Sequence, residues 1–320
     1  MVVKAYEKYV RRVVEVLKDY VNIWCTINEP NIYTAFGYIL GEFPPGESNF
    51  RKAYQVVLNQ IRAHAAAYHA IHSLQSHARV GTAIHYRSFR PEKKWSPPDK
   101  LIRNLIHGAF NNLYPRAFQD GIVRLPFVRM RIPEAKGTQD YLGVNYYTRE
   151  YVAFSFSEPD QLFVRRSLDP KKELSDTGFM ANEPEGMFEA LKWGRQFNVP
   201  MIVAENGIED SDDHLRPRYI VEHIHQIWRA VNFNWPIKGY FHWSLVDNFE
   251  WERGWTQRFG LWELDRDTQA RIRRPSADLY AEICKENGLS VDMVRRYAPE
   301  AYESMFPAQI ESSQLTGEQH

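Results

Sequence analysis

Long hydrophobic runs, a net charge and a framework of cysteines are all missing from this sequence of 320 residues. No stretch approaches the roughly 18 apolar residues that a membrane-spanning helix needs. The 40 basic residues balance the 40 acidic ones, so the chain lacks the positive charge expected of a nucleic-acid-binding protein. Cys25 and Cys284 are too few for a disulfide framework, and the first seven residues become polar too soon for a signal peptide. We therefore expect a cytoplasmic protein that binds neither membranes nor nucleic acids.

The sequence also lacks the short motifs of several enzyme classes. No Gly-x-Gly-x-x-Gly follows an apolar run, which argues against a dinucleotide-binding fold. There is no phosphate-binding glycine loop and no Gly-x-Ser-x-Gly motif of the serine hydrolases. His223 and His225 stand two residues apart, and such positions do not face one another on a helix. We expect neither a metal ion nor a cofactor.

Apolar runs alternate with helical patterns along the chain. Five runs predict buried strands at 21–27, 79–85, 140–146, 200–205 and 238–245. Apolar residues at helical spacing predict helices over 4–20, 50–77, 99–119, 184–197, 215–232 and 275–287. This alternation is typical of a parallel sheet covered by helices, either doubly wound or closed as a (β/α)8 barrel. Long polar, aromatic-rich segments after the strands favour the barrel. We predict one domain over 1–306 and a polar tail over 307–320.

Polar side chains follow four of the predicted strands, at the edge where parallel strands all end. Asn28 and Glu29 follow the first strand, Asn145 and Tyr147 stand at the end of the third, Glu205 ends the fourth, and Glu250 stands in the segment after the fifth. Most of the tryptophans lie in the C-terminal third, between Trp228 and Trp262. Two carboxyl groups beside aromatic surface suggest glycoside hydrolysis, in which one protonates the leaving oxygen and the other attacks or stabilises the anomeric carbon.

Each of these residues alone also has an ordinary structural interpretation. A single glutamate at a strand end is usually a surface charge, and Trp243 or Trp251 alone would usually be a core residue. The catalytic interpretation depends on the coincidence of two Asn/Glu pairs at two strand ends, with Glu250 embedded among tryptophans.

At these residues the sequence resembles family 1 of the glycoside hydrolases, the β-glucosidase family. Residues 26–30 (TINEP) resemble the acid/base motif of the family, and residues 203–207 (VAENG) resemble its nucleophile motif. Residues 243–251 (WSLVDNFEW) and 258–261 (RFGL) resemble its sugar-binding stretch, and 142–147 (LGVNYY) also fits. The resemblance extends from about residue 1 to residue 290.

The resemblance implies a (β/α)8 barrel that hydrolyses β-glycosides with retention of configuration, without metal or cofactor. It makes Glu29 the general acid/base and Glu205 the nucleophile, with Tyr147 holding the pKa of Glu205 down. The substrate-binding residues that it implies are Asn28, Asn145, Tyr147, Trp243, Glu250, Trp251 and Phe259. Glu250 would repel a phosphate group. The resemblance therefore favours, as the substrate, a terminal, non-phosphorylated β-D-glucoside or related β-glycoside.

The chain departs from the family pattern at its beginning and near the aglycone side. Five strands are predicted where the family has eight, so we expect a chain without the first three strands of the barrel, with two open edges through which it could self-associate. Phe179 stands where the family often has a tryptophan, and Ala204 replaces the usual threonine. The alternative to a working β-glycosidase is an inactive remnant that binds carbohydrate or self-associates.

Overall fold

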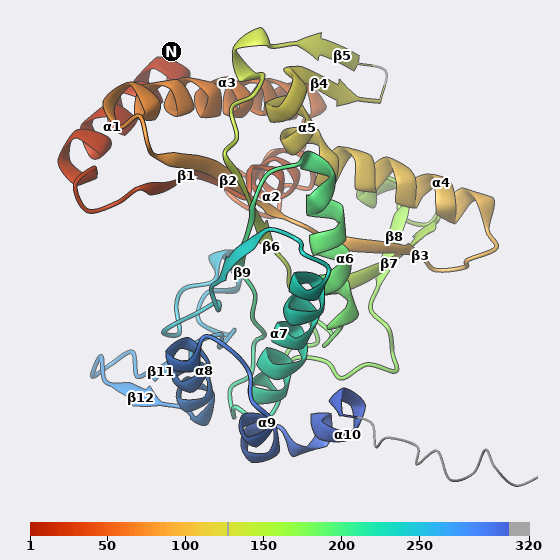
Figure 1. Cartoon of the computed structure of the whole chain (residues 1–320). Coiled ribbons are helices and arrows are strands. Elements are labelled where there is room, and N and C mark those ends of the chain that lie inside the picture. Colours follow the sequence, from red (N-terminus) through yellow and green to blue (C-terminus); the bar gives the residue numbers. More distant parts are fainter. Residues whose placement is uncertain (127, 307–320) are drawn as a thin grey trace, which may run out of the picture.

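The computed structural model describes residues 1–126 and 128–306, so the predicted polar tail over 307–320 lies outside the described residues. Its centre is a parallel sheet of five strands in the order β1-β2-β6-β9-β10 (Figure 1). These strands are β1 (Ile23–Asn28), β2 (Arg79–His85), β6 (Tyr141–Asn145), β9 (Met201–Glu205) and β10 (Ile237–Tyr240). All five predicted strands are confirmed, and their spatial order follows the sequence, as in one arc of a barrel.

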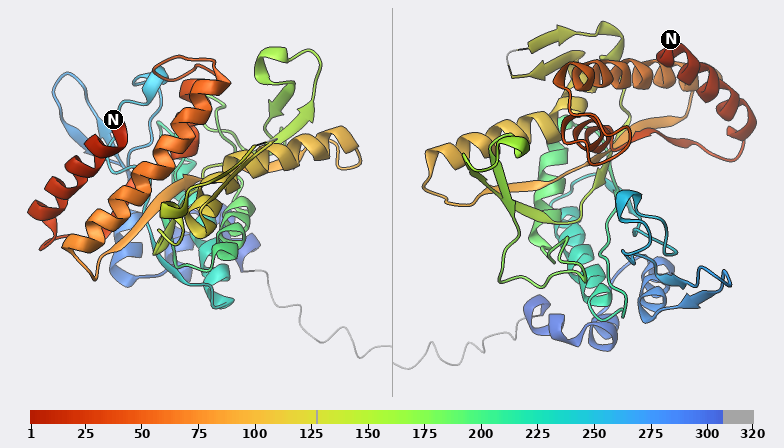
Figure 2. Two further views of the ribbon diagram at one scale, coloured as in Figure 1. Left: turned by 90° about the horizontal axis from the view of Figure 1, so that it is seen from above. Right: turned by 180° about the vertical axis from the view of Figure 1, so that it is seen from behind.

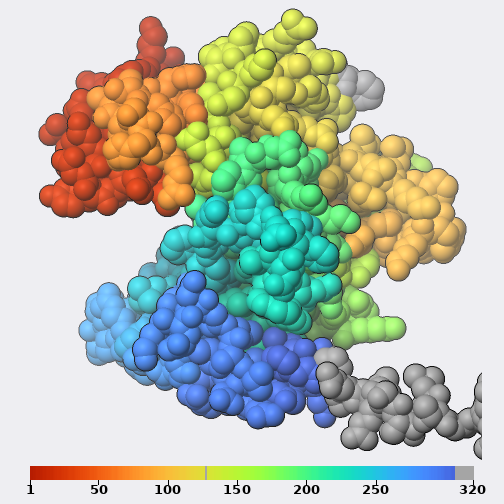
Figure 3. All heavy atoms as spheres, in the orientation of Figure 1, coloured from red at the N-terminus to blue at the C-terminus, as the bar shows by residue number. Residues whose placement is uncertain are grey.

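Helices connect successive strands and cover the outer face of the sheet. The main helices are α1 (Val2–Leu17), α3 (Phe50–Leu74), α6 (Glu185–Gly194), α7 (Arg216–Asn232) and α8 (Pro275–Glu286). The side chain of Asn49 caps α3 by accepting a hydrogen bond from the backbone of Lys52. The N-terminal and C-terminal helices lie at opposite ends of the molecule (Figures 1 and 3). No helix within the two described ranges is both long and apolar enough to cross a membrane.

The helix predicted over 99–119 is interrupted in its middle. It consists of α4 (Pro97–Ile106), the wider-wound η2 (His107–Asn112) and α5 (Leu113–Asp120). Pro115 lies just beyond the interruption and has no amide hydrogen to donate to the preceding turn, which accounts for the break in regular helical bonding. The predicted strand over 238–245 ends early, at Tyr240, because the chain then leaves the sheet to form the loop that contains Trp243.

Several further elements were not predicted from the sequence, and most of them are too short to show a clear pattern. Three small sheets lie beside the main one (Figure 2). They contain β3 (Ser88–Pro91), β7 (Arg149–Phe154) and β8 (Val164–Ser167); β4 (Ile122–Leu125) and β5 (Val128–Arg131); and β11 (Trp262–Leu264) and β12 (Arg271–Arg273). The remaining helical segments are α2 (Pro30–Thr34), η1 (Ala35–Ile39), η3 (Pro133–Ala135), η4 (Pro159–Gln161), η5 (Arg195–Phe197), η6 (Trp251–Arg253), α9 (Val291–Tyr297), η7 (Pro299–Ala301) and α10 (Tyr302–Met305).

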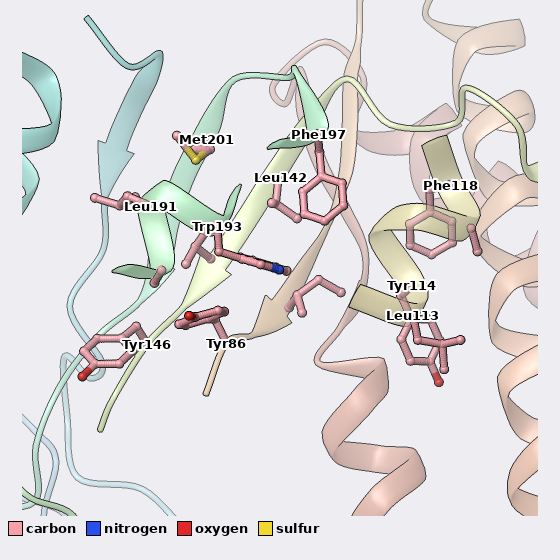
Figure 4. Close-up of a cluster of buried hydrophobic side chains, with 14 of the residues drawn as sticks. Tyr86, Leu113, Tyr114, Phe118, Leu142, Tyr146, Leu191, Trp193, Phe197 and Met201 are labelled. Atoms are coloured by element: carbon pink, nitrogen blue, oxygen red, sulfur yellow. The ribbon is translucent and has the colours of Figure 1, made fainter. Parts of the chain in front are cut away.

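The largest core lies between the sheet and the helices outside it (Figure 4). Leu142 and Met201 from neighbouring strands pack there with Leu191 and Trp193 of α6. The indole N–H of Trp193 donates a 2.7 Å hydrogen bond to Asn112, so its one polar atom is satisfied inside the core. Burying each large apolar side chain stabilises the fold by about 1.5–3 kcal/mol. This packing keeps the strands in a fixed register, and it therefore fixes the relative positions of their C-terminal ends.

Candidate active site

The ends of neighbouring strands bring the predicted polar residues to one edge of the sheet. His85 of β2 lies in register beside Asn145 of β6, and Asn145 lies in register beside Glu205 of β9. Glu29 follows β1 directly, and its backbone N–H donates to the carbonyl of Ala83 in β2 at 2.8 Å. Four segments that are far apart in the sequence thus converge.

Two asparagines connect the carboxyl groups of Glu29 and Glu205. Asn145 Nδ2 donates to Glu29 Oε1 at 2.9 Å and to Asn28 Oδ1 at 3.3 Å. Asn28 Nδ2 in turn donates to Glu205 Oε1 at 2.9 Å. The two carboxyl groups therefore belong to one continuous hydrogen-bond network.

Glu29 is held in an uncommon backbone conformation. It has φ +46° and ψ +53°, the left-handed region, which a residue with a side chain occupies at a cost of about 1–3 kcal/mol. Pro30 immediately begins α2, and the hydrogen bond from Glu29 to Ala83 fixes the turn. Such local strain is concentrated at functional sites, and here it directs the Glu29 carboxyl group to its partners.

A cavity of about 530 Å³ contains almost all of the predicted site residues. Its lining includes Asn28, Glu29, Tyr147, Glu205, Trp243, Glu250, Trp251 and Phe259. Asn145 is fully buried behind this lining and reaches the site through its two hydrogen bonds. A larger hollow of about 730 Å³ over α6, α7 and α10 contains none of the predicted residues.

Close backbone packing and buried polar contacts fix the loop that carries Trp243, Glu250 and Trp251. A side chain at Gly207 would place its Cβ only 1.8 Å from the carbonyl oxygen of Trp243, so this position requires glycine. The buried carboxylate of Asp247 accepts hydrogen bonds from the backbone of Gly260 at 2.8 Å and from Arg274 at 3.0 Å. Together these contacts anchor both ends of the loop against β9 and α8.

The cavity raises the pKa values of two of its carboxyl groups. Burial and the nearby Glu29 carboxylate raise the pKa of Glu205 to about 8, although hydrogen bonds from Tyr147 (2.5 Å) and Asn28 oppose the shift. Burial and the Glu29 charge raise the pKa of Glu250 to about 7. Glu205 has no ion-pair partner within residues 1–126 and 128–306.

Glu29 is shifted in the opposite direction. Burial alone would raise its pKa, but the His85 ring, hydrogen bonds from His85 and Asn145, and the Arg87 charge together lower it. This order is the reverse of the one that glycoside hydrolysis needs for the roles implied by the resemblance, in which the acid has the higher pKa and the nucleophile the lower. The physical reason is that His85 lies against Glu29, with smaller contributions from Asn145 and Arg87, whereas Glu205 has no ion-pair partner among the described residues.

Comparison with known proteins identifies the architecture around this cavity. Residues 1–289 match the family model described as glycosyl hydrolase family 1. The chain belongs to glycosyl hydrolase family 1. It is 35% identical over 289 residues to a β-galactosidase of Saccharolobus solfataricus, covering 86% of this chain and 57% of that protein. It is 32% identical over 311 residues to β-glucosidase A of Thermotoga maritima, covering 89% of this chain and 68% of that protein.

Solved structures of other glycosidases of this family superpose closely on the chain described here. The β-glycosidase from Pyrococcus horikoshii gives a TM-score of 0.84 at 32% identity, covering 92% of this chain and 68% of that one. The β-glucosidase from T. maritima in complex with deoxynojirimycin gives 0.83 at 29% identity, covering 90% and 69%. These glycosidases are (β/α)8 barrels, and the parallel sheet described here is part of such a barrel. The chain spans 57–62% of the length of the three archaeal β-galactosidases that it matches.

Three polar residues on the Glu29 side of the site, His85, Arg87 and Glu150, were not predicted from the sequence of this family 1 chain. His85 Nδ1 lies 2.9 Å from Glu29 Oε1, and Arg87 lies behind His85, paired with Glu150 at 2.5 Å. The signal was available, because His85 ends the second predicted strand as Asn145 ends the third, but a lone histidine in an apolar run did not stand out.

One aromatic residue of the cavity lining, Phe43, was also missed. Phe43 stacks on Trp251 with ring centroids 5.2 Å apart and an angle of 11° between the planes. Arg253 lies 4.2 Å above the ring of Phe179, the residue at the position where the family often has a tryptophan. One face of Trp251 is therefore covered by protein.

Proposed function

We propose that this site hydrolyses terminal, non-phosphorylated β-D-glucosides or related β-glycosides by double displacement, with retention of configuration. The observation that carries this proposal is the single network joining the carboxyl groups of Glu29 and Glu205 in an aromatic-lined cavity of about 530 Å³. Relatives named β-galactosidase and β-glucosidase support the class of substrate.

The proposed reaction assigns different tasks to the two glutamates. In the first step a Glu205 carboxylate oxygen attacks the anomeric carbon, while Glu29 gives its proton to the departing glycosidic oxygen. In the second step Glu29 takes a proton from water, which attacks the anomeric carbon and releases Glu205. The hydrogen bonds from Asn28 and Tyr147 hold Glu205 in place and stabilise its carboxylate form.

The remaining residues are proposed to hold the sugar. The indole of Trp243 offers a flat apolar face for the C–H surface of a pyranose ring, and Phe259 lines the wall beside Tyr147. Glu250 and Trp251 offer an acceptor and a donor for the hydroxyls far from the scissile bond. Asn145 lies behind the cavity lining, so we propose that it supports Glu29 and Asn28 through its two hydrogen bonds instead of contacting the sugar.

A second candidate function is carbohydrate binding or self-association without turnover. It is favoured by the open edges of the sheet, since neither β1 nor β10 has a second strand partner within the described ranges. A cytoplasmic location is supported by the two unpaired cysteines and by a relative named cytosolic β-glucosidase from Homo sapiens, 28% identical to this chain.

Hydrolysis of an aryl β-glucoside by the purified chain tests the proposal. We expect Glu205→Ala to abolish turnover, and azide to restore turnover of an activated substrate by Glu29→Ala, giving the β-glucosyl azide. The reverse pattern of rescue would exchange the two assignments. Activity no higher than that of Glu205→Ala, together with measurable glucose binding by calorimetry, would support the second candidate and contradict the first.

A further inference from the structure

Gln257 is a buried glutamine in the wall of the cavity, and no step of the proposed reaction uses it. It lies in the loop between η6 and β11, and like Phe259 of the same loop it lines the cavity. Gln257 is only 1% exposed, and neither its Oε1 nor its Nε2 has a hydrogen-bond partner within residues 1–126 and 128–306. Over these ranges it is the only side chain with two buried polar atoms that lack a partner.

A buried amide without partners destabilises the folded chain. The group has lost its hydrogen bonds to water and has gained none in return, which is why the great majority of buried polar groups in proteins are paired. Methionine, which is unbranched and of similar length, would fill the same space without this cost. The position of Gln257 in the lining of a cavity accounts for the exception, because the missing partner can be a molecule that enters the cavity.

The backbone on both sides of Gln257 is fixed, although its amide is not. Thr256 closes a turn by donating from its hydroxyl to the Arg253 carbonyl at 2.7 Å. On the other side, the Arg258 carbonyl accepts a 2.9 Å hydrogen bond from the backbone N–H of Asp210. Gln257 therefore keeps its place in the wall, while its amide can turn toward a ligand without breaking a hydrogen bond.

The chemistry of the amide indicates what it binds. It has two N–H donors and one carbonyl acceptor, and it carries no charge. A neutral group that both donates and accepts matches it, and a sugar hydroxyl is such a group. A cation would satisfy only the carbonyl and an anion only the N–H groups. The carboxyl group of Glu250, in the same lining, further disfavours an anion.

We propose that Gln257 binds a hydroxyl of the sugar at C4 or C6, on the side far from the scissile bond. The inference rests on the proposed function, which puts the sugar in this cavity. We choose this side because Glu29 and Glu205 come from the ends of β1 and β9, whereas Gln257 shares the loop after β10 with Glu250. Gln257 is thereby a specificity-determining residue, since a sugar without this hydroxyl leaves the amide unpaired.

Combining a change in the residue with a change in the sugar tests this contact. Gln257→Met removes the donors and the acceptor, and calorimetry measures the binding of glucose and of its 2-, 3-, 4- and 6-deoxy forms without turnover. For the loss of one or two neutral hydrogen bonds we expect glucose to bind roughly 5- to 50-fold more weakly. Either 4-deoxyglucose or 6-deoxyglucose should bind the variant and the parent alike, because that sugar lacks the contacted hydroxyl.

Gln139→Met is the matched control for these titrations. Gln139 also has a buried Oε1 without a partner among the described residues, but it does not line the cavity. We expect this variant to bind every sugar as the parent does. The melting temperature without ligand adds a second readout, since removal of the unpaired amide in Gln257→Met should raise it by about 2 °C or more.

The results that would overturn the inference are distinct from those that uphold it. They are glucose binding by folded Gln257→Met equal to that of the parent, an equal loss for every sugar together with a lower melting temperature, or a loss that disappears only with 2-deoxyglucose. Gln257→Asn, which shortens the side chain and withdraws the amide, serves for the same titrations if the methionine variant does not fold.

The same titrations separate this inference from the proposed function. A selective loss in a chain that hydrolyses no aryl β-glucoside would uphold the inference and contradict the proposed function. Hydrolysis by the parent, with an unselective loss of binding in Gln257→Met, would uphold the proposed function and overturn the inference.

Discussion

The hydroxyl of Tyr147, in the segment after β6, donates a 2.5 Å hydrogen bond to Oε2 of Glu205 at the end of β9. This contact opposes the burial and charge repulsion that raise the pKa of Glu205. Tyr147→Phe keeps the ring that stacks on His85 and removes only the donor. Because a hydrogen bond to a charged group contributes about 1.5–3 kcal/mol, we expect kcat/KM to fall roughly 10- to 100-fold.

Steady-state kinetics on an aryl β-glucoside measure this loss. Tyr54→Phe is a suitable control, since the Tyr54 hydroxyl contacts Met130 outside the cavity. A Tyr147→Phe variant with unchanged kcat/KM would show that the hydroxyl does not stabilise the attacking carboxylate.

The raised pKa of Glu205 predicts a definite dependence of stability on pH. Between pH 4.5 and about 8 the folded protein keeps a proton on Glu205 that the unfolded chain has released. Unfolding then releases a proton, so the free energy of unfolding falls as pH rises through this window. Glu205→Gln is uncharged throughout, and we expect it to gain at least about 1 kcal/mol over the parent between pH 5 and pH 8.

Thermal unfolding at several pH values tests this sign. The melting temperature of Glu205→Gln should exceed that of the parent by more at pH 8 than at pH 5. Glu189→Gln, which removes a carboxylate outside the cavity that is paired with Arg149, should show no such widening with rising pH. An equal difference at all pH values would mean that Glu205 ionises at its ordinary pKa.

Trp243 provides a prediction about binding rather than proton transfer. If its indole is the platform under the sugar, Trp243→Ala removes apolar contact area and should lower kcat/KM about 10- to 100-fold, chiefly through a higher KM. Trp228→Ala is the matched control, because Trp228 is 58% exposed on α7 and does not line the cavity. Equal effects of the two variants would contradict the role of Trp243.

The sequence indicated the parallel sheet and most of the site for identifiable physical reasons. Strands of a parallel sheet are apolar on both faces, so runs such as 79–85 could be located, and their polar ends mark the edge that carries the candidate site. Glu29, Asn145 and Glu205 could be found because each stands directly at such an end.

Other features depend on contacts that no local pattern records. The pKa order of Glu29 and Glu205 depends first on where His85 lies in space, and then on Asn145 and on Arg87, which stands behind the ring of His85. The stacking of Phe43 on Trp251 joins segments from opposite halves of the chain. The hairpin of β11 and β12 has only three residues in each strand, too few for a periodicity to be recognised.

Glu250 predicts discrimination against phosphorylated sugars. Its carboxyl group lines the cavity, where its pKa is raised to about 7, so above that pH it is charged and repels a sugar phosphate. We expect the parent to prefer an aryl β-glucoside over its 6-phosphate in kcat/KM, and Glu250→Gln to narrow this preference at pH 8 more than at pH 6. A preference that does not change in the variant would remove Glu250 from this role.

The free edge of β1 predicts concentration-dependent self-association. β1 pairs with β2 on one side only within the described ranges, and Ile23 at its start is 38% exposed, so an unpaired strand edge with apolar character faces outward. A charge on such an edge opposes strand pairing, and we expect Ile23→Lys to shift the chain toward the monomer in size-exclusion chromatography with light scattering. Val291→Lys is the matched control, because Val291 is equally exposed, at 38%, but begins a helix. Oligomers that persist in Ile23→Lys, or that Val291→Lys dissociates equally well, would show that association does not proceed through this edge.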